Sequence, residues 1–477
     1  MNLINAMKNH NVIKNTKGGL YYKSSLNANL DFFSGVSRHN SVNDIQNAFA
    51  KAFIEDDMTA IANLLYVLDI RGGKGERRIF KECFSLLANA DKKMALKVLY
   101  LIPILGRYDY ILEGLNTLID EEVVALIIEQ LDKDMNSDNP SLLAKWLPSL
   151  RTHNKNNHLA KHLVNKLNMS EKEYSKVLST LRSKINIVEK NITNKTFDNI
   201  NFNAVPCKAM LKYQDFFKNN ITEEYNEYLN SLTKGEAKVN TSGLFCYEII
   251  NKVWKNNYKK DVLIDTMWTQ QKDVLNGINK NILVVADTSG SMTWNNSLPL
   301  ANSIGLALYT AERNTGIFKD CFITFSSNPT IQKVTGENIS QKVRNIKTIN
   351  SNTDIDKVFK LILKEFMNEN VDKQDFPSHI LIVSDMEFDD GVYSKGGTNF
   401  EGWKKAFEAK GFKLPTIIFW NVACYTKGLP VTKKDNDVVM VSGFSTNVLE
   451  NIFNLDNYNP IDCMLTTLSK YLKLIKD

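Results

Sequence analysis

The sequence predicts a multidomain protein in two parts, an all-α N-terminal half and an α/β C-terminal half with a parallel sheet. Before about residue 275, apolar residues recur at helical spacing and strand signals are scarce. After that point, short runs rich in Val and Ile alternate with amphipathic segments. At 477 residues the chain is long enough for more than one buried core. We therefore predict domains at residues 1–275 and 276–477.

The N-terminal half contains a series of helical segments joined by short polar turns. They are expected at 41–68, 76–90, 92–104, 108–119, 121–132, 141–147, 156–167, 171–190 and 207–219. Short connections favour antiparallel neighbours, so we expect stacked helix pairs of the kind found in HEAT-like repeats. The sequence has no fixed period, so any repeat is one of structure and not of sequence.

The C-terminal half alternates between strand and helix signals. Strands are expected at 281–287, 318–325, 378–386, 414–421 and 438–443, with a short edge strand at 329–334. Helices are expected at 298–313, 354–369, 400–409 and 459–475. This alternation is typical of a parallel sheet with helices on both faces.

Polar side chains stand where two of these strands end. Asp287 follows one apolar strand and is followed in alternate positions by Ser289 and Ser291. Asp385 follows a second strand, and Thr353 stands just before a predicted helix. In open α/β sheets, ligands bind in the crevice at the carboxyl ends of the strands. Carboxylate and hydroxyl oxygens suit Mg²⁺ better than zinc or copper, so the sequence predicts a site for Mg²⁺ or another divalent cation.

Positive charge is concentrated in the helical half. Residues 141–220 contain 12 Lys and 2 Arg against 3 Glu and 2 Asp, whereas the whole chain has a net charge of +6. Such a field attracts polyanions, and salt would weaken their binding. A glycine-rich basic string at 71–78 lacks the Walker A pattern; it predicts either a phosphate-gripping turn or an ordinary helix–helix turn with exposed basic residues. The candidate RNA contacts, chosen by charge and position, are Arg71, Lys74, Arg77, Arg78, Lys155, Lys161 and Arg182.

Bulk properties favour a cytoplasmic protein. The six cysteines are scattered without CxxC spacing, which is typical of reduced thiols in a reducing compartment. No uninterrupted apolar run is long enough to span a membrane, and the first residues lack a signal-peptide core. Nothing in the sequence indicates DNA specificity. The abundance of Lys and Asn suggests an AT-rich bacterial or phage genome.

Several short strings, taken together, resemble one family. They are NTKGGL (15–20), LDFF (30–33), RGGKGER (71–77), GRYD (106–109), KWLPS (145–149), LR (181–182), VE (188–189), VP (205–206) and VSGFS (441–445). With the Asp-x-Ser-x-Ser string they resemble the Ro-like proteins, which join a TROVE-type helical-repeat module to a von Willebrand factor A (vWA) domain. The chain looks closest to a branch catalogued mainly as a domain of unknown function.

The resemblance implies a fold, a metal site and a partner. It implies a Rossmann-like vWA domain at 276–477 that closes a ring of HEAT-like repeats, and non-catalytic binding of small structured or single-stranded RNA. In its metal-ion-dependent adhesion site (MIDAS), Ser289, Ser291 and Thr353 would be hydroxyl ligands of Mg²⁺, and Asp287 and Asp385 would act directly or through water. Two other functions stay open. One is a metal-dependent module that binds an acidic residue of a protein partner, and the other is a metal-dependent hydrolase.

Overall fold

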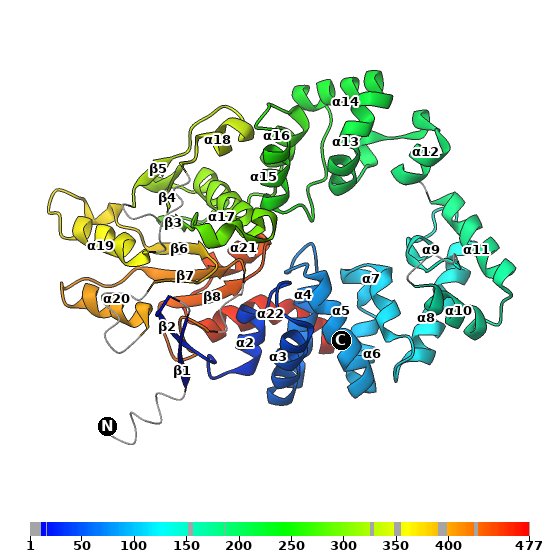
Figure 1. Cartoon of the computed structure of the whole chain (residues 1–477), viewed down its shortest axis with the longest axis horizontal. Coiled ribbons are helices and arrows are strands. Elements are labelled where there is room, and N and C mark those ends of the chain that lie inside the picture. The colour runs from blue at the N-terminus through cyan, green and yellow to red at the C-terminus, as the bar shows by residue number, and fades with distance from the viewer. Residues whose placement is uncertain are drawn as a thin grey trace.

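The computed structural model describes residues 11–15, 17–150, 156–185, 187–324, 329–347, 354–389, 398–423 and 428–476. It has the two predicted parts, a helical N-terminal region followed by a C-terminal sheet with helices packed against it (Figure 1). Among the described residues, no helix combines the length and apolar character that crossing a membrane requires.

A six-stranded sheet forms the centre of the C-terminal half. Its strands, in spatial order, are β5 (Ile331–Lys333), β4 (Cys321–Thr324), β3 (Ile282–Ala286), β6 (His379–Ser384), β7 (Thr416–Asn421) and β8 (Val438–Ser442). All neighbours are parallel except β5, which pairs antiparallel with β4 at the edge. Every residue of β3, β6 and β8 is buried, which explains their continuous apolar sequences. The predicted strands, including the edge strand, are confirmed.

The helices of this half are, in chain order, α17 (Trp294–Arg313), α18 (Ile339–Asn345), α19 (Ile355–Phe366), α20 (Asn399–Glu408), α21 (Asn447–Phe453) and α22 (Pro460–Lys476). Three successive residues of α17, 295–297, have positive φ, so its regular part begins near the predicted residue 298. The short helices α18 and α21 were not predicted, because seven residues are too few for a helical period to show.

The helical half contains a longer series of elements. They are α2 (Ala28–Gly35), α3 (Val42–Glu55), α4 (Asp57–Leu68), α5 (Arg77–Ala90), α6 (Lys92–Leu99), α7 (Ile102–Leu105), the 3₁₀ helix η2 (Tyr108–Gly114), α8 (Asp120–Met135), α9 (Leu143–Trp146), α10 (Asn157–Lys166), α11 (Glu171–Lys184), α12 (Val188–Asn194), α13 (Cys207–Asn220), α14 (Thr222–Lys234), α15 (Cys246–Lys255) and α16 (Val262–Thr269). A small antiparallel hairpin of β1 (Val12–Lys14) and β2 (Leu20–Tyr22) precedes them.

Some predicted helices are divided in the structure. The segment predicted as one helix at 41–68 forms α3 and α4, because the side chain of Asp56 accepts a hydrogen bond from the backbone N–H of Thr59 and starts a new helix. The segments 92–104 and 171–190 are likewise each divided in two. The predicted helix at 108–119 is a 3₁₀ helix that ends at Gly114.

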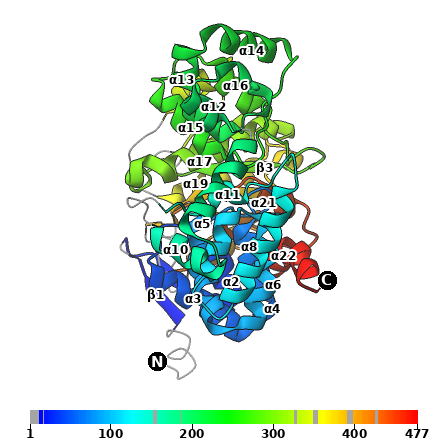
Figure 2. The ribbon, with the colours of Figure 1, turned by 90° about the vertical axis from the view of Figure 1, so that its right-hand side faces the viewer.

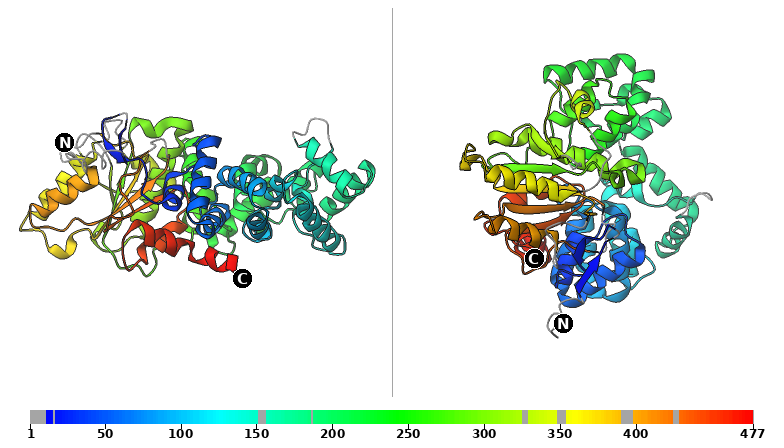
Figure 3. Two further views of the ribbon diagram at one scale, coloured as in Figure 1. Left: turned by 90° about the horizontal axis from the view of Figure 1, so that it is seen from below. Right: turned by 60° about the vertical axis from the view of Figure 1, so that its left-hand side comes forward.

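The helical half begins and ends on the α/β half. At its start, α2 packs against β8 and α4 packs against α22; at its end, α15 packs against α17. The helices between these contacts run out and back, so the chain forms a closed circuit (Figure 1). We call residues 28–114 the first arm and residues 207–269 the second arm. Helices α8 to α11 lie at the far end from the sheet, where Figure 2 views them face on and Figure 3 shows them in profile.

Candidate metal centre and basic cleft

Two neighbouring strands bring the predicted acidic residues together. Strands β3 and β6 are paired in parallel, with Ala286 opposite Val383, so both chains leave the sheet at the same edge. Asp287 is the next residue after β3, and its backbone N–H donates to the carbonyl of Val383 (2.9 Å). Asp385 lies two residues beyond Val383. Both carboxylates are fully buried. The prediction that the two aspartates lie side by side is confirmed.

Hydroxyl and amide groups surround Asp287. Its Oδ1 accepts a hydrogen bond from the backbone N–H of Ser289 (2.9 Å), and its Oδ2 accepts one from the hydroxyl of Ser384 (2.6 Å). The hydroxyl oxygens of Ser289 and Ser291 lie 3.1 Å apart. Ser289 therefore contacts Asp287, and Ser291 lies beside Ser289. We call Asp287, Asp385 and the serines 289, 291 and 384 the carboxylate site. The predicted ligand Thr353 lies outside the described residues.

Ser384 is a member of this site that the sequence interpretation did not assign. It is the last residue of β6 and lies in register beside Asp287, one step after the Ala286–Val383 pair. Its hydroxyl also accepts a hydrogen bond from the backbone N–H of Met386 (3.0 Å). Its position directly before Asp385 was the available signal, because the last residues of neighbouring parallel strands lie next to each other at one edge of the sheet.

The electrostatics of the carboxylate site fit a divalent cation. Burial first, and then the negative charge of Asp385, raise the pKa of Asp287 well above its ordinary value. The hydrogen bonds from Ser384 and Ser289 oppose this rise only in part. A bound cation would relieve the repulsion between two buried carboxylates, and the oxygen donors present are those that Mg²⁺ prefers. The nearby Thr288 hydroxyl is also buried and has no hydrogen-bond partner within the described ranges. The residues present fit Mg²⁺ or a similar hard cation.

The glycine-rich string at 71–78 contains one structural lysine. Lys74 is buried, and its ammonium donates to the backbone carbonyls of Phe33 (2.7 Å) and Val36 (3.2 Å) at the end of α2. Gly73 is required beside it, because a Cβ there would lie 2.1 Å from the carbonyl oxygen of Tyr66. Lys74 was predicted to contact RNA. That prediction is wrong in this structure, since the ammonium is enclosed between α2 and the α4–α5 turn.

The remaining basic residues of this string line a cleft between the two arms. The cleft has a volume of about 650 Å³. Arg77, Arg78 and Lys81 reach it from the first arm, and Lys208 from the second. We call it the basic cleft. Its basic and aromatic lining residues are Arg38, Arg77, Arg78, Lys81, Arg107, Lys208, Tyr110, Phe245 and Tyr247.

Ion pairs hold the cations of the basic cleft in place. Arg77 and Arg107 both donate to Asp109, each at 2.6 Å, and Arg38 binds both carboxylate oxygens of Glu76. The cations are the more exposed partners: the Arg77 side chain is 52% exposed and that of Asp109 only 9%. The cleft also contains the carboxylates of Glu76 and Glu82. The geometry thus offers guanidinium groups to a ligand over a layer of buried acids, and Tyr247 is the partly exposed aromatic ring among the lining residues named here.

Arg78 differs from the other arginines of the cleft. Its guanidinium donates to the backbone carbonyls of Arg38 (2.7 Å) and Asn40 (3.0 Å), and its side chain is exposed. Backbone carbonyls orient the group but do not cancel its charge. Arg78 is therefore a charged, fixed and accessible donor in the cleft.

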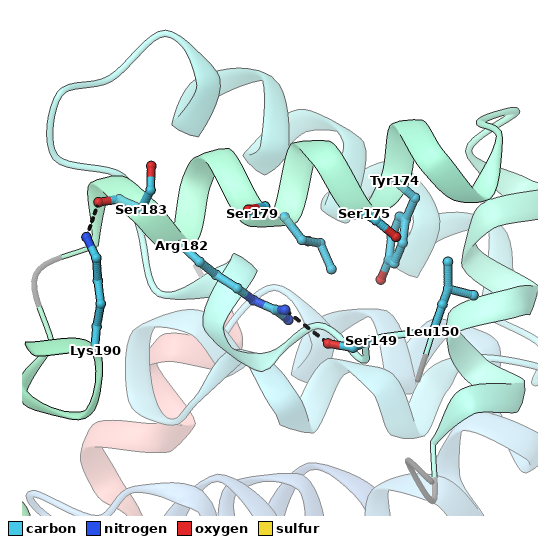
Figure 4. A pocket seen from close by; sticks show the side chains of 9 residues that line it. Ser149, Leu150, Tyr174, Ser175, Ser179, Arg182, Ser183 and Lys190 are labelled. Atoms are coloured by element: carbon cyan, nitrogen blue, oxygen red, sulfur yellow. Dashed lines mark hydrogen bonds between the residues drawn. The ribbon is translucent and has the colours of Figure 1, made fainter. Parts of the chain in front are cut away.

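Arg182 has a mainly architectural environment. It donates from α11 to the carbonyls of Ala144 and Leu147 (both 2.8 Å) and to the hydroxyl of Ser149 (3.0 Å). These bonds fix α11 to the α9 region. Arg182 also lines a cavity of about 560 Å³ together with several serines and Lys190 (Figure 4). The sequence could not reveal that most of this guanidinium is already engaged.

The other candidate RNA contacts are dispersed. Arg71 is exposed and lines a separate cavity of about 370 Å³ between the two arms and the α21 end of the sheet. Lys161 is exposed on α10 at the far end of the circuit. Lys155 lies outside the described residues. The structure therefore gathers Arg77 and Arg78 in the basic cleft and does not unite the rest of the set.

Comparison with known proteins gives likenesses without a named activity. Residues 281–462 match the family described as "Domain of unknown function (DUF7788)", and residues 121–292 match "Domain of unknown function (DUF2828)". The chain is also 28% identical over 500 residues to "Uncharacterized protein L728" of Acanthamoeba polyphaga mimivirus. That likeness covers 95% of this chain and 87% of the viral protein, so it spans both halves of the molecule.

Proposed function

We propose that the protein is a non-catalytic RNA-binding scaffold, in which an α/β domain of vWA type closes a ring of helices and binds Mg²⁺. The observation that carries the proposal is the closed circuit. Because the first arm starts on β8 and the second arm ends on α17, the arms face each other across the basic cleft. The Ro-like resemblance implies the same architecture, with HEAT-like repeats in the helical half.

The chemistry of the basic cleft suits single-stranded RNA. Guanidinium groups bind phosphate through paired donors, and aromatic rings stack on unpaired bases. The cleft holds both kinds of group within one volume, with the partly exposed Tyr247 on the second arm and Arg77 and Arg78 on the first. Residues 141–220 add a second basic region along the outer circuit, which would attract a structured RNA by its long-range field.

The Mg²⁺ site would serve as a binding group and not as a catalyst. Asp287 and Asp385 would hold the ion, with Ser289 and Ser291 supplying hydroxyl oxygens. The ion would supply a Lewis-acidic position for an oxygen of a partner. Ser384 would orient Asp287 through its 2.6 Å hydrogen bond.

The test is RNA binding by a triple variant of the cleft. Arg77→Gln, Arg78→Gln and Lys208→Gln together remove three exposed charges from both arms. A labelled single-stranded RNA should bind the wild-type chain in low salt, and the triple variant should bind more weakly. The slope of log affinity against log salt should fall by up to about 2, at about 0.7 for each lost phosphate contact. Fluorescence anisotropy across a salt series measures both quantities.

The matched control carries the same charge change elsewhere. Lys364→Gln, Lys404→Gln and Lys410→Gln remove three exposed charges from the outer face of the α/β half. This control should keep the wild-type affinity and salt slope. Equal weakening by both triple variants would show non-specific attraction only, and absence of RNA binding by the wild type would refute the proposal.

A second function, metal-dependent capture of a protein carboxylate, is favoured by Trp294. This side chain stands three residues after Ser291 and is 54% exposed, although it is a large apolar group. An exposed aromatic beside a cation site is typical of a protein-binding surface. If a protein partner is retained only in the presence of Mg²⁺, and ribonuclease treatment does not release it, this function is favoured over the first.

A further inference from the structure

The N-terminal hairpin lies across the loop that carries Asp385. Gly18 forms a bridge to Asp389, and Tyr22 pairs with Leu429 through both backbone hydrogen bonds (2.8 Å each). The hairpin is thus joined to two loops of the α/β half, although it is more than 360 residues distant from them in sequence. In Figure 1 it lies beside the sheet, near α2.

Tyr21 makes the central contact of the hairpin with the Asp385 loop. Its side chain is 2% exposed. Its hydroxyl donates to the carbonyl of Met386 (2.6 Å) and accepts from the backbone N–H of Phe388 (3.2 Å). Asn15 adds a bond from its side-chain amide to the carbonyl of Phe388 (2.8 Å), and its own Oδ1 accepts from the N–H of Gly19 (2.7 Å).

The loop that Tyr21 holds is conformationally demanding. Met386, the residue after Asp385, has φ of +64°. A non-glycine residue in the left-handed region costs on the order of 1 kcal/mol or more, so its surroundings must hold it there. Two partners do so: Ser384 Oγ accepts a hydrogen bond from the N–H of Met386, and the Tyr21 hydroxyl donates one to the carbonyl of Met386. The direction of the Asp385 side chain depends on this backbone, because Asp385 Oδ1 accepts from the N–H of Glu387 (3.0 Å) in the same turn.

We propose that Tyr21, with the β1–β2 hairpin, is a positioning element for the cation site. It fixes the left-handed turn at Met386 and thereby holds Asp385 beside Asp287. This inference rests on the proposed Mg²⁺ site. Because linkage is reciprocal, Mg²⁺ binding should in turn tighten the hairpin against the loop. Loss of the contacts between the hairpin and the Asp385 loop would therefore lower the affinity for the cation, although the hairpin itself supplies no ligand.

The hairpin supplies its own matched control. Tyr21→Phe keeps the buried ring and removes the hydroxyl that binds the 386–388 backbone. Tyr22→Phe removes the hydroxyl of the next residue, which binds Glu401 on α20 (2.8 Å) and not the Asp385 loop. Mg²⁺ titration of the full chain by calorimetry should give an affinity about tenfold lower for Tyr21→Phe, in the range found for outer-shell partners of metal ligands. Tyr22→Phe should stay near the wild-type affinity.

The outcomes separate the two proposals. If the wild type does not bind Mg²⁺, the proposed metal site is overturned, and the positioning role is overturned with it. If the wild type binds Mg²⁺ and Tyr21→Phe binds it equally well, or Tyr22→Phe weakens it as much, only the positioning role is overturned.

A second readout needs no Tyr21 variant and covers the case in which Tyr21→Phe does not fold. In the wild type, saturating Mg²⁺ should slow hydrogen exchange at the amides of Tyr22 and Phe388. In Gly19→Ala, whose Cβ would lie 2.8 Å from the carbonyl oxygen of Phe388, this protection should be lost. Unchanged exchange in the wild type at saturating Mg²⁺ would also overturn the positioning role.

Discussion

The carboxylate site and the basic cleft differ in whether their buried acids are paired with cations. In the cleft, each buried acid is matched by cations: Asp109 binds two arginines and Glu76 binds Arg38. At the carboxylate site, Asp287 receives its hydrogen bonds from a backbone amide and a serine hydroxyl, while burial and Asp385 raise its pKa. Matched acids hold cations in position. Two buried acids that repel each other raise the energy of the folded protein, and a bound cation would reduce that repulsion.

The largest expected effect comes from removing one of the two carboxylates that repel each other. Asp287→Asn keeps the size of the side chain and removes one charge. Mg²⁺ affinity should fall by more than the roughly 10–100-fold loss that follows removal of an outer-shell partner. Without Mg²⁺, the variant should unfold at the wild-type temperature or above it, because one of two repelling buried charges is gone. Calorimetry and thermal unfolding with and without Mg²⁺ measure both effects.

The exposed acid Asp372 provides the control for this prediction. Asp372→Asn should leave the Mg²⁺ response unchanged. Wild-type Mg²⁺ affinity in Asp287→Asn would show that the paired carboxylates are not a cation site.

The carboxylate site was largely predictable because parallel strands restrict geometry. Once β3 and β6 are neighbours, Asp287 and Asp385 must leave the sheet at the same edge, whatever the rest of the fold does. The same pleated register places Ser384 beside Asp287. Apolar strand sequences and strand-end polar residues carry this information locally, so the sequence reveals it.

The cleft was less predictable because charge does not reveal whether a side chain faces inward. Lys74 and Arg78 stand four residues apart in one basic string, yet Lys74 is buried against α2 and Arg78 is exposed. The difference depends on the position of α2 relative to the α4–α5 turn. Tyr21 is harder still, because its partners are more than 360 residues away and no local pattern links them.

A pair of variants in the basic string sharpens this difference. Lys74→Met removes two hydrogen bonds from a charged donor, while Ser442 still reaches the same two carbonyls (3.2 and 3.4 Å). We expect a loss of about 2 kcal/mol in the free energy of unfolding, near the value for one hydrogen bond to a charged group. The folded variant should bind RNA as the wild type does.

Arg78→Gln should show the reverse pattern. Its loss of unfolding free energy should stay within about 0.5 kcal/mol, as for most surface changes. Its RNA affinity and salt slope should both fall. Denaturant unfolding and anisotropy on the two variants test the contrast, which fails if Lys74→Met weakens RNA binding by the folded protein as much as Arg78→Gln does.

The last expected effect concerns the opposite end of β6, where a buried titratable group is kept neutral. His379 begins the strand that ends before Asp385, and its ring packs against Phe453 and Tyr458. Burial, and then the nearby ammonium of Lys280, lower the pKa of His379 to about 4. The imidazole bonds Ser378 through Nδ1 (2.8 Å), and its Nε2 has no hydrogen-bond partner among the described residues. A proton there would be neither solvated nor paired.

The sign of the pH dependence follows from this lowered pKa. Between about pH 6.5 and pH 4 the unfolded chain binds a proton that the folded chain does not, so stability falls as the pH falls. His379 should contribute a loss of about 2 kcal/mol between pH 7 and pH 5. His379→Gln should flatten the unfolding profile over this interval, whereas His158→Gln, at an exposed position on α10, should leave it unchanged. An unaltered profile in His379→Gln would mean that the strand tolerates charge at its start. Burial alone would then be a weaker argument for the proposed cation at the carboxylate site at its other end.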